Sequence, residues 1–378
     1  MLQLYDSLAR IKKDFKPYDK NNVLLYVCGI TPNNATHLGH AFTYVMFDTL
    51  IRFLKFQNFG VTYVQNATDV NDSNDVIQQA KETGKTWIEI SKIWIEHFQN
   101  QMSALNVARP DKYLLASNFI DKIISINEKL IAKGFAYEKN GNVYFDISKS
   151  NDYGSLSKYG KEQMLMISIE RGNDPKDPNK KNPLDFVLWI SDSGEPHWDS
   201  PWGNGRPGWH IECSAMIESA LGEQIDIHGG GRDLIFPHHE SEKAQAESLT
   251  GKKPYVQFWM HTGMVMYEGE KMSKSLGNLV LVEELLKQHS PSAIRWLLLS
   301  HHYRHPWEYE QEELKNYELR ITNLGKKIQE SDRGEWRIIE EFLEDDFNTP
   351  EVLRYLQAEC TGETLKRGLD LLGLIIKN

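Results

Sequence analysis

Two short segments carry residue types that could bind a nucleotide. The first, Thr36 to His40, reads Thr-His-Leu-Gly-His and lies where an expected loop meets an expected helix. Backbone N–H groups and the helix dipole favour phosphate there, glycine permits close approach, and imidazoles can donate to developing charge. Histidines that only cap a helix would give the same pattern. The candidate ATP-binding residues are Thr36, His37, Gly39 and His40, and the two histidines are also candidate catalytic residues.

The second segment, Lys271 to Asn278, reads Lys-Met-Ser-Lys-Ser-Leu-Gly-Asn. Lys271 and Lys274 on a mobile loop can meet the ATP phosphates while charge passes to the leaving pyrophosphate. We take both lysines as catalytic candidates and, with Ser273, as ATP-binding candidates. A solvated basic turn would look the same, but the two segments in this order are typical of class I aminoacyl-tRNA synthetases.

Two cysteines, a histidine and a glutamate suggest a metal centre. Cys28 follows a predicted strand, Cys213 lies in a helix-like stretch, and His238 and Glu242 share one face of a helix opened by Pro237. Two thiolates, an imidazole and a carboxylate suit Zn²⁺. Buried cysteines are more often inert core residues, and a His/Glu pair at this spacing is more often a surface pair. The residues alone leave both interpretations open.

Over roughly Met1–Tyr309 the chain resembles the cysteinyl-tRNA synthetases. The shared motifs are Tyr26–Thr31, Gly208–Ser214, Gly229–Gly231, Phe236–Glu240 and the lysine segment. The resemblance implies an α/β fold, with a Rossmann-type parallel-sheet nucleotide-binding domain split by a connective insertion and followed by a C-terminal helical domain. It also implies that Cys28, Cys213, His238 and Glu242 bind zinc, and that Gly29, Thr31, Thr68, Trp209 and Asp233 bind substrate.

The activity implied by the resemblance is formation of a cysteinyl adenylate from cysteine and ATP, with Mg²⁺ accompanying the nucleotide. Zn²⁺ would select the cysteine thiolate, because the hydroxyl of serine is a poor soft ligand, and no editing domain would be needed. Four protein ligands normally make a closed site. We therefore hypothesise that substrate expands the coordination or displaces a weak ligand, for which Glu242 is the candidate.

Local patterns predict the elements that position these residues. Val23–Val27 and Val61–Asn66 read as strands that flank a helix from Gly39 to Leu54, which makes a parallel crossover unit. Asn140-Gly141 predicts a hairpin turn, and Asn348-Thr349-Pro350 predicts a helix start. We expect residues 1–85 to form the first half of the Rossmann domain, 86–206 the insertion, 207–309 the second half and 310–378 a helical bundle.

The acceptor of the activated cysteine is less determined. Typical synthetases of this family continue into an anticodon-binding domain, which is not expected here, and residues 311–378 hold 15 Asp/Glu against 10 Lys/Arg. One hypothesis is transfer to tRNA(Cys) recognised through its acceptor arm. The other is a mycothiol-type ligase that joins cysteine to the amine of glucosaminyl-inositol, which Glu170–Pro175, Thr36 and the Asn278–Val282 stretch resemble. Glu242 and the Asp226–Gly229 stretch favour tRNA, as does a composition rich in Lys, Ile and Asn.

Composition limits the class of protein. The 378 residues are 40% hydrophobic and 25% charged, with a formal charge of −10, which gives no general argument for nucleic-acid binding. Three cysteines cannot form a disulfide framework in a chain of this size, and no apolar run is long enough to span a membrane, so we expect a cytoplasmic protein. The sequence does not determine the oligomeric state, for which we favour a monomer. A catalytically dead binding paralogue is a further possibility that intact nucleotide and metal motifs disfavour.

Overall fold

A five-stranded parallel sheet forms the centre of the computed structural model, which describes residues 1–70, 75–272 and 276–376. The strand order is β11-β10-β3-β4-β5. The strands span Asn22–Ile30 (β3), Gly60–Ala67 (β4), Lys112–Leu115 (β5), Ile225–Gly231 (β10) and Val256–Thr262 (β11). Every pairing in this sheet is parallel, as helix-covered α/β folds require. The predicted fold class is confirmed.

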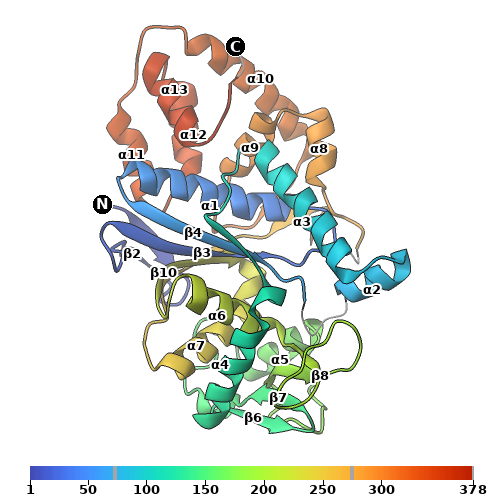
Figure 1. Cartoon of the computed structure of the whole chain (residues 1–378). Coiled ribbons are helices and arrows are strands. Elements are labelled where there is room, and N and C mark those ends of the chain that lie inside the picture. Colours follow the sequence, from blue (N-terminus) through green and yellow to red (C-terminus); the bar gives the residue numbers. More distant parts are fainter. Residues whose placement is uncertain (71–74, 273–275, 377–378) are drawn as a thin grey trace.

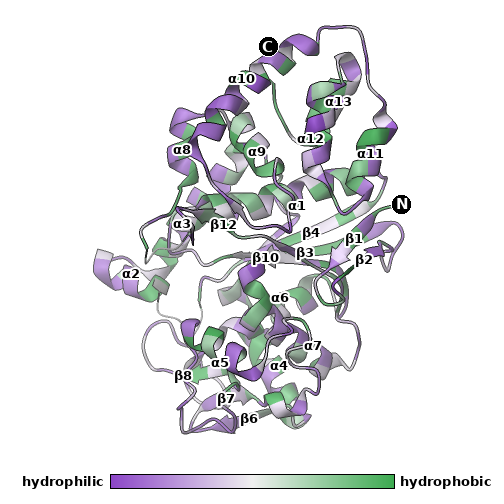
Figure 2. Cartoon of the chain, turned by 180° about the vertical axis from the view of Figure 1, so that it is seen from behind, coloured by the Kyte–Doolittle hydropathy of each residue, from purple (hydrophilic) through white to green (hydrophobic). Residues whose placement is uncertain are grey.

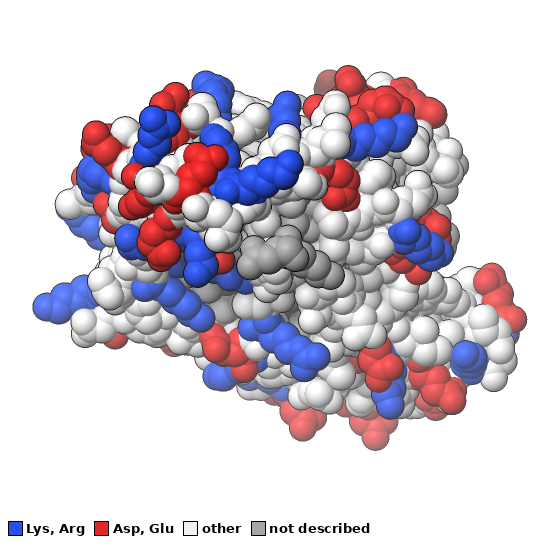
Figure 3. All heavy atoms as spheres, turned by 90° about the horizontal axis from the view of Figure 1, so that it is seen from above, with Lys and Arg blue, Asp and Glu red and all other residues white. Residues whose placement is uncertain are grey.

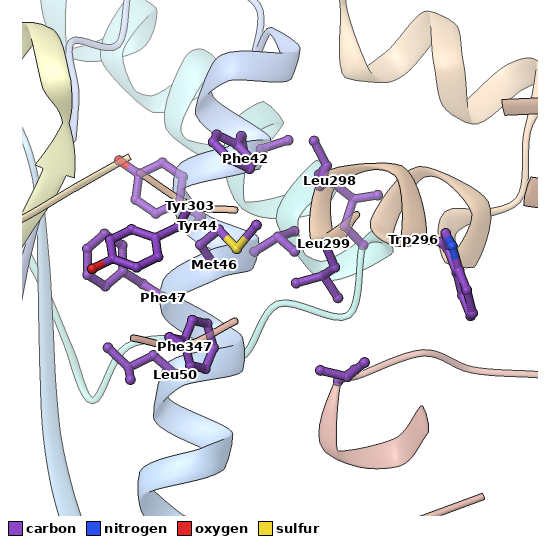
Figure 4. Packing of buried hydrophobic residues seen from close by; sticks show 14 of the residues in the cluster. Phe42, Tyr44, Met46, Phe47, Leu50, Trp296, Leu298, Leu299, Tyr303 and Phe347 are labelled. Atoms are coloured by element: carbon purple, nitrogen blue, oxygen red, sulfur yellow. The ribbon is translucent and has the colours of Figure 1, made fainter. Parts of the chain in front are cut away.

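The predicted crossover unit is present, with helix α1 at Leu38–Phe56 between β3 and β4 (Figure 1). Helix α1 is apolar on most of its surface because it is covered on two sides. It packs against the sheet and against α9 (Pro291–Leu299), where Leu298 and Leu299 face Met46 (Figure 4). The end of α1 that carries the histidine motif is thereby held by the largest hydrophobic cluster.

The sheet continues beyond the expected start of the insertion at residue 86. Helices α2 (Asp75–Thr83) and α3 (Trp87–Ala104) follow β4, and β5 then pairs with β4 at the sheet edge. Phe98 and Met102 of α3 pack in the same cluster as α1. Strand β5 was not predicted, because its four residues, Lys-Tyr-Leu-Leu, have too short an apolar pattern to be recognised as a strand. The domain boundary at residue 86 stays a prediction.

A smaller antiparallel sheet lies below the parallel one in Figure 1. Its strands are β6 (Ala136–Lys139), β7 (Asn142–Phe145), β8 (Phe186–Ser191) and β9 (Gly205–Pro207), with helices α4 (Ile120–Ala132) and α5 (Lys161–Glu170) nearby. Asn140 and Gly141 both have positive φ, so the predicted hairpin turn is confirmed. The chain returns to the parallel sheet through α6 (Trp209–Ala220), and α7 (Glu240–Thr250) follows β10.

Short strands surround the lysine segment. Strand β12 (Val265–Tyr267) pairs with β13 (Glu270–Lys271) and with β14 (Trp307–Glu308), and α8 spans Val282–Gln288. Near the N-terminus, β1 (Gln3–Asp6) pairs with β2 (Ile11–Asp14). Ser273 and Lys274 lie outside the described residues.

The last described residues are helical, as expected. Helices α10 (Gln311–Lys327), α11 (Trp336–Glu344), α12 (Thr349–Ala358) and α13 (Gly362–Leu371) follow β14. Asn348 caps α12 by accepting a hydrogen bond from the Glu351 N–H, which confirms that helix start. These helices contribute buried residues to the same hydrophobic cluster as α1, so they share its core instead of forming a separate one.

The surface around these helices is mixed in charge and largely hydrophilic. Figure 2 colours much of α8 and α10 as hydrophilic, and α10 buries only Leu314, Tyr317, Ile321 and Leu324. Seen from above, acidic and basic side chains are interspersed (Figure 3). Within the described residues no helix combines the length and apolar character needed to cross a membrane.

Candidate active site and metal centre

Four side chains from four elements meet at the carboxyl end of β3. Cys28 lies in β3, Cys213 on α6, His238 in the short helical turn η4 (Ile235–His239) and Glu242 on α7. One ligand atom from each lies within 4.8 Å of all the others, and all four residues are buried. The sequence expectation that His238 and Glu242 face one another is confirmed, since His238 Nε2 lies 2.9 Å from Glu242 Oε1.

The spacing of these atoms fits a small tetrahedral cation. Cys28 Sγ lies 3.9 Å from Cys213 Sγ and 3.8 Å from Glu242 Oε1. Two sulfurs bonded at about 2.3 Å to one Zn²⁺ with tetrahedral angles stand about 3.8 Å apart. Two thiols with one imidazole and one carboxylate are donors that zinc accepts. The four residues therefore match zinc in donor type, number and spacing.

The pKa values of Glu242 and His238 are shifted in opposite directions. Burial opposes ionisation of Glu242, but His228 and His238 outweigh it and lower the pKa of the carboxyl to about 2. Burial likewise disfavours charge on His238, but Glu242 and Cys213 outweigh it and raise the pKa of the imidazole to about 10. These opposite shifts favour an ion pair between the two side chains, and a bound cation would take the place of the proton on His238.

A row of further histidines backs the metal centre, and sequence reasoning did not assign it. His239 Nε2 lies 3.3 Å from Cys28 Sγ, and His239 Nδ1 lies 2.8 Å from His261 Nε2. His261 Nδ1 in turn lies 2.8 Å from Ser7 Oγ. On the other side, His228 Nε2 lies 2.8 Å from Glu242 Oε2. Cys28, His228, His239 and Glu242 form a second overlapping group of potential ligands.

The histidine motif opens α1 and has two structural roles. His37 is the N-cap residue, with Nδ1 accepting a hydrogen bond of 3.1 Å from the Gly39 N–H, and its ring stacks on His40 at 3.7 Å. Burial lowers the pKa of His37 to about 4 and that of His40 well below its usual value. Both rings are therefore neutral near pH 7, so they can donate an N–H without carrying charge.

The segment that follows the lysines is tied to this motif. The Leu38 N–H donates to the Val280 carbonyl at 2.8 Å, and the Val282 N–H donates to the Thr36 carbonyl at 3.0 Å. Lys271 is exposed and pairs through its backbone with Met266 of β12. Residues 280–282, which follow the lysine motif, thus lie beside the histidine motif, whereas Ser273 and Lys274 are outside the described residues.

One cavity of about 300 Å³ joins the metal centre to the histidine motif. It is lined by all five substrate-binding candidates, by the four candidates of the histidine motif and by three of the metal ligands: Gly29, Thr31, Thr68, Trp209, Asp233, Thr36, His37, Gly39, His40, Cys28, Cys213 and His238. Glu242 and Lys271 are not among the lining residues. Glu242 therefore lies behind the other ligands, on the side away from the cavity.

Local packing explains two of these positions. A Cβ atom on Gly29 would lie 1.5 Å from the Asn66 carbonyl oxygen, so only glycine lets β3 and β4 close here, and the Gly29 N–H donates to Asn66 Oδ1 at 2.7 Å. Trp209 begins α6 and stacks on His238 at 4.4 Å and 14°. One face of the indole thus supports a metal ligand.

Comparison with known proteins identifies the family. Residues 14–318 match the family model described as tRNA synthetases class I (C) catalytic domain. The chain is 43% identical to a cysteine–tRNA ligase of Thermococcus onnurineus, over 93% of this chain and 78% of that protein. This chain belongs to the cysteinyl-tRNA synthetase family. A second such ligase, from Legionella pneumophila, is 42% identical and is matched by 100% of this chain over 86% of its own length.

Solved structures support the fold. A methionyl-tRNA synthetase of Mycobacterium tuberculosis in complex with methionyl-adenylate aligns with a TM-score of 0.66 at 16% identity. The alignment covers 93% of this chain and 88% of that one. At this identity the likeness establishes a class I synthetase fold and nothing finer.

One sequence feature could have pointed to the histidines that were not assigned. His228 precedes a run of three glycines, and His239 directly follows the candidate ligand His238. Buried histidines beside a metal commonly orient its ligands. Such a residue in a strand otherwise looks like a core position, so the pattern alone could not separate the two roles.

Proposed function

We propose that this chain is an ATP-dependent ligase that activates cysteine as cysteinyl adenylate at a zinc centre and transfers it to tRNA(Cys). The observation that carries the proposal is the shared cavity, which has two thiols and an imidazole at one end and the histidine motif at the other. An amino acid held between them would place its side chain toward the thiols and its carboxylate toward a bound nucleotide.

Cys28, Cys213, His238 and Glu242 would hold the zinc ion. Bound Zn²⁺ supplies a soft Lewis acid that accepts a cysteine thiolate and rejects the hydroxyl of serine. Glu242 is the ligand that we expect to yield when a substrate thiolate binds, because its Oε2 already has a partner in His228 at 2.8 Å. His228 can keep the carboxylate satisfied while the protein sulfurs and His238 stay in place.

The nucleotide end works through position and hydrogen bonding. The first backbone N–H groups of α1 and the neutral imidazoles of His37 and His40 donate toward the phosphates of ATP, which arrives with Mg²⁺. The cysteine carboxylate attacks the α-phosphate in line and pyrophosphate leaves. We assign Lys271, Ser273 and Lys274 to the departing charge. The hydrogen bonds from Leu38 to Val280 and from Val282 to Thr36 support this assignment, because they hold the chain that follows the lysine motif next to the histidines.

The remaining cavity residues are assigned to the amino acid and the adenylate. Asp233 and Trp209 both line the cavity. We assign Asp233 to the α-ammonium and Trp209 to an aromatic wall beside the cysteine side chain. Gly29 lies in β3 and Thr31 directly follows that strand, while Thr68 directly follows β4, and all three line the cavity. We assign Gly29 and Thr31 to the substrate and Thr68 to the adenylate. A strand end beside a helix N-terminus is where open parallel sheets bind nucleotides.

The acceptor is assigned from the relatives, which carry the name cysteine–tRNA ligase. That name favours the ribose hydroxyl of tRNA over the amine of glucosaminyl-inositol, although the Glu170–Pro175 motif resembles the mycothiol-type enzymes. A cytoplasmic place of action is in keeping with three free, buried cysteines.

The proposal is tested by cysteine-dependent exchange of pyrophosphate into ATP, measured with zinc-loaded and chelator-treated protein. We expect exchange with cysteine, none with serine, and loss after chelation that added zinc restores. Equal exchange with serine, or exchange indifferent to zinc, would remove the zinc assignment. For Glu242, the variant Glu242→Gln must alter cysteine affinity or its zinc dependence, and unchanged values would exclude it as the exchanged ligand.

A further inference from the structure

An ion pair joins two residues that line the active-site cavity, Arg171 and Asp233. Arg171 ends helix α5, and Asp233 lies in the short helical turn η3 (Arg232–Leu234) that follows β10. Arg171 Nη2 donates to Asp233 Oδ2 at 2.9 Å. Their side chains are 32% and 38% exposed, so the pair faces solvent and either partner can be displaced without unpacking a core.

The cavity has few charged side chains along its wall, and this ion pair brings two of them together. Among the described lining residues, Asp233 is the one carboxylate and Arg171 is the one lysine or arginine. An amino acid in the cavity brings an ammonium group that needs an anionic partner. The carboxylate available for that role already accepts a hydrogen bond from a guanidinium of the protein itself.

We propose that Arg171 is a latch on the amino-acid site, whose guanidinium occupies on Asp233 the place that the substrate ammonium takes. Cysteine binds by displacing it. This inference rests on the proposed function, because that function assigns Asp233 to the substrate ammonium. It adds Arg171, at the C-terminal end of α5, as a residue that sets the affinity for the amino acid. The latch is closed when the cavity is empty and open when it is filled.

The displaced side chain has a place to go. A second hollow of about 230 Å³ adjoins the first, and Arg171 and Trp209 line both. The second hollow also has Asp174 and Asp177 on its wall, which can receive the guanidinium. Opening the latch therefore exchanges one carboxylate partner for another at the boundary between the two hollows, and leaves no charge unpaired.

The expected effect is modest because the pair is exposed. Exposed ion pairs contribute a small stabilisation, which corresponds to roughly a 1.5- to fivefold change in binding. In Arg171→Ala we expect the KM for cysteine in pyrophosphate exchange to fall by this factor with kcat unchanged. Lys176→Ala, in the same loop with an exposed side chain, removes the same charge without touching Asp233 and should leave KM unchanged.

Two cysteine analogues separate the latch from a general opening of the cavity. Cysteamine keeps the ammonium and lacks the carboxylate, so its inhibition constant should fall in Arg171→Ala together with the KM for cysteine. 3-Mercaptopropionate lacks the ammonium and should gain nothing. A gain shared by both analogues, or an unchanged or increased KM for cysteine, would overturn the latch.

A double variant keeps the test decisive if the single change perturbs folding. In a background that carries Asp233→Asn, the carboxylate is absent and Arg171 has nothing to block. Adding Arg171→Ala to this background should therefore leave the cysteine affinity of the Asp233→Asn variant unchanged. A gain that persists in the double variant contradicts the latch. If unmodified protein shows no cysteine-dependent exchange at all, the proposed function fails; if exchange is normal and only the variants disagree, the latch alone fails.

Discussion

Cys213 and Cys360 are both buried cysteines with very different surroundings. Cys213 lies 3.9 Å from a second thiol and within reach of an imidazole and a carboxylate, whereas Cys360 is packed in the main hydrophobic cluster. We expect Cys213→Ser to lower zinc affinity by more than about tenfold, because a serine oxygen is a poorer zinc donor. The measurement is metal content by mass spectrometry after dialysis against a fixed chelator. Cys360→Ser is the control and should retain its zinc.

His37 combines capping with a proposed catalytic donor, and two substitutions separate these roles. Asparagine is a good N-cap and lacks the imidazole, so His37→Asn should slow pyrophosphate exchange by about 100-fold while the melting temperature holds. His37→Ala should slow exchange equally and also cost about 1 kcal/mol of stability. Exchange that survives in His37→Asn would reduce this residue to a helix cap.

At the scale of elements, Arg295 connects α9 to α1 and to the C-terminal ends of helices α3 and α13. It is fully buried, pairs with Asp48, donates to Thr49 Oγ1 and also donates to the carbonyls of Leu372 and Leu105. Removing one partner of a buried ion pair is costly. Asp48 would keep Arg52, whose Nε lies 2.8 Å from Asp48 Oδ2, but the carbonyls of Leu372 and Leu105 would lose their buried donor.

We therefore expect Arg295→Ala to lower the free energy of unfolding by about 3–5 kcal/mol. Equilibrium urea unfolding measures this loss. Arg354, which is 71% exposed, is the matched control, and Arg354→Ala should change stability by no more than about 0.5 kcal/mol. Similar losses for both variants would show that the α1–α9 contact does not depend on the buried pair.

Elements with local signals were predictable from the sequence. The β3–α1–β4 unit, the hairpin at Asn140-Gly141 and the start of α12 depend on periodicity, turn residues and a cap, all of which are readable along the chain. Strand β5 was not predictable, because its pairing with β4 is what makes it a strand.

The site divides in the same way. The residues from Thr36 to His40 and the four metal ligands were named from motifs, and the structure brings them to one cavity and its rear wall. The histidines behind them could not be assigned, because their role depends on contacts between β10, β11 and η4 that no spacing encodes. The ion pair between Arg171 and Asp233 could not be predicted either, because the two residues are 62 positions apart and only the fold brings α5 next to η3.

At the scale of the whole molecule, partly buried neutral histidines couple folding to pH. Burial lowers the pKa of His37, His301 and His302 to about 4, against about 6.5 in an unfolded chain. Between these values the unfolded chain binds more protons than the native one, so stability falls as the pH decreases from about 7 to about 5. The urea midpoint should drop accordingly.

A single substitution tests this cause. His301 stacks on Trp307 at 3.9 Å and 4°, and His301→Gln removes its titration while keeping a flat polar side chain. The variant should lose less stability than the unmodified protein over the same pH range. An identical loss in both proteins would exclude His301 as a source of the acid sensitivity.

The central claim is that cysteine activated in this cavity is delivered to tRNA. In the most direct test, zinc-loaded protein is incubated with cysteine, ATP, total tRNA and glucosaminyl-inositol together, and the cysteinylated product is identified by mass spectrometry. We predict a cysteinyl ester on the terminal adenosine of tRNA(Cys), with glucosaminyl-inositol unchanged. A cysteinyl amide on glucosaminyl-inositol with uncharged tRNA would contradict it.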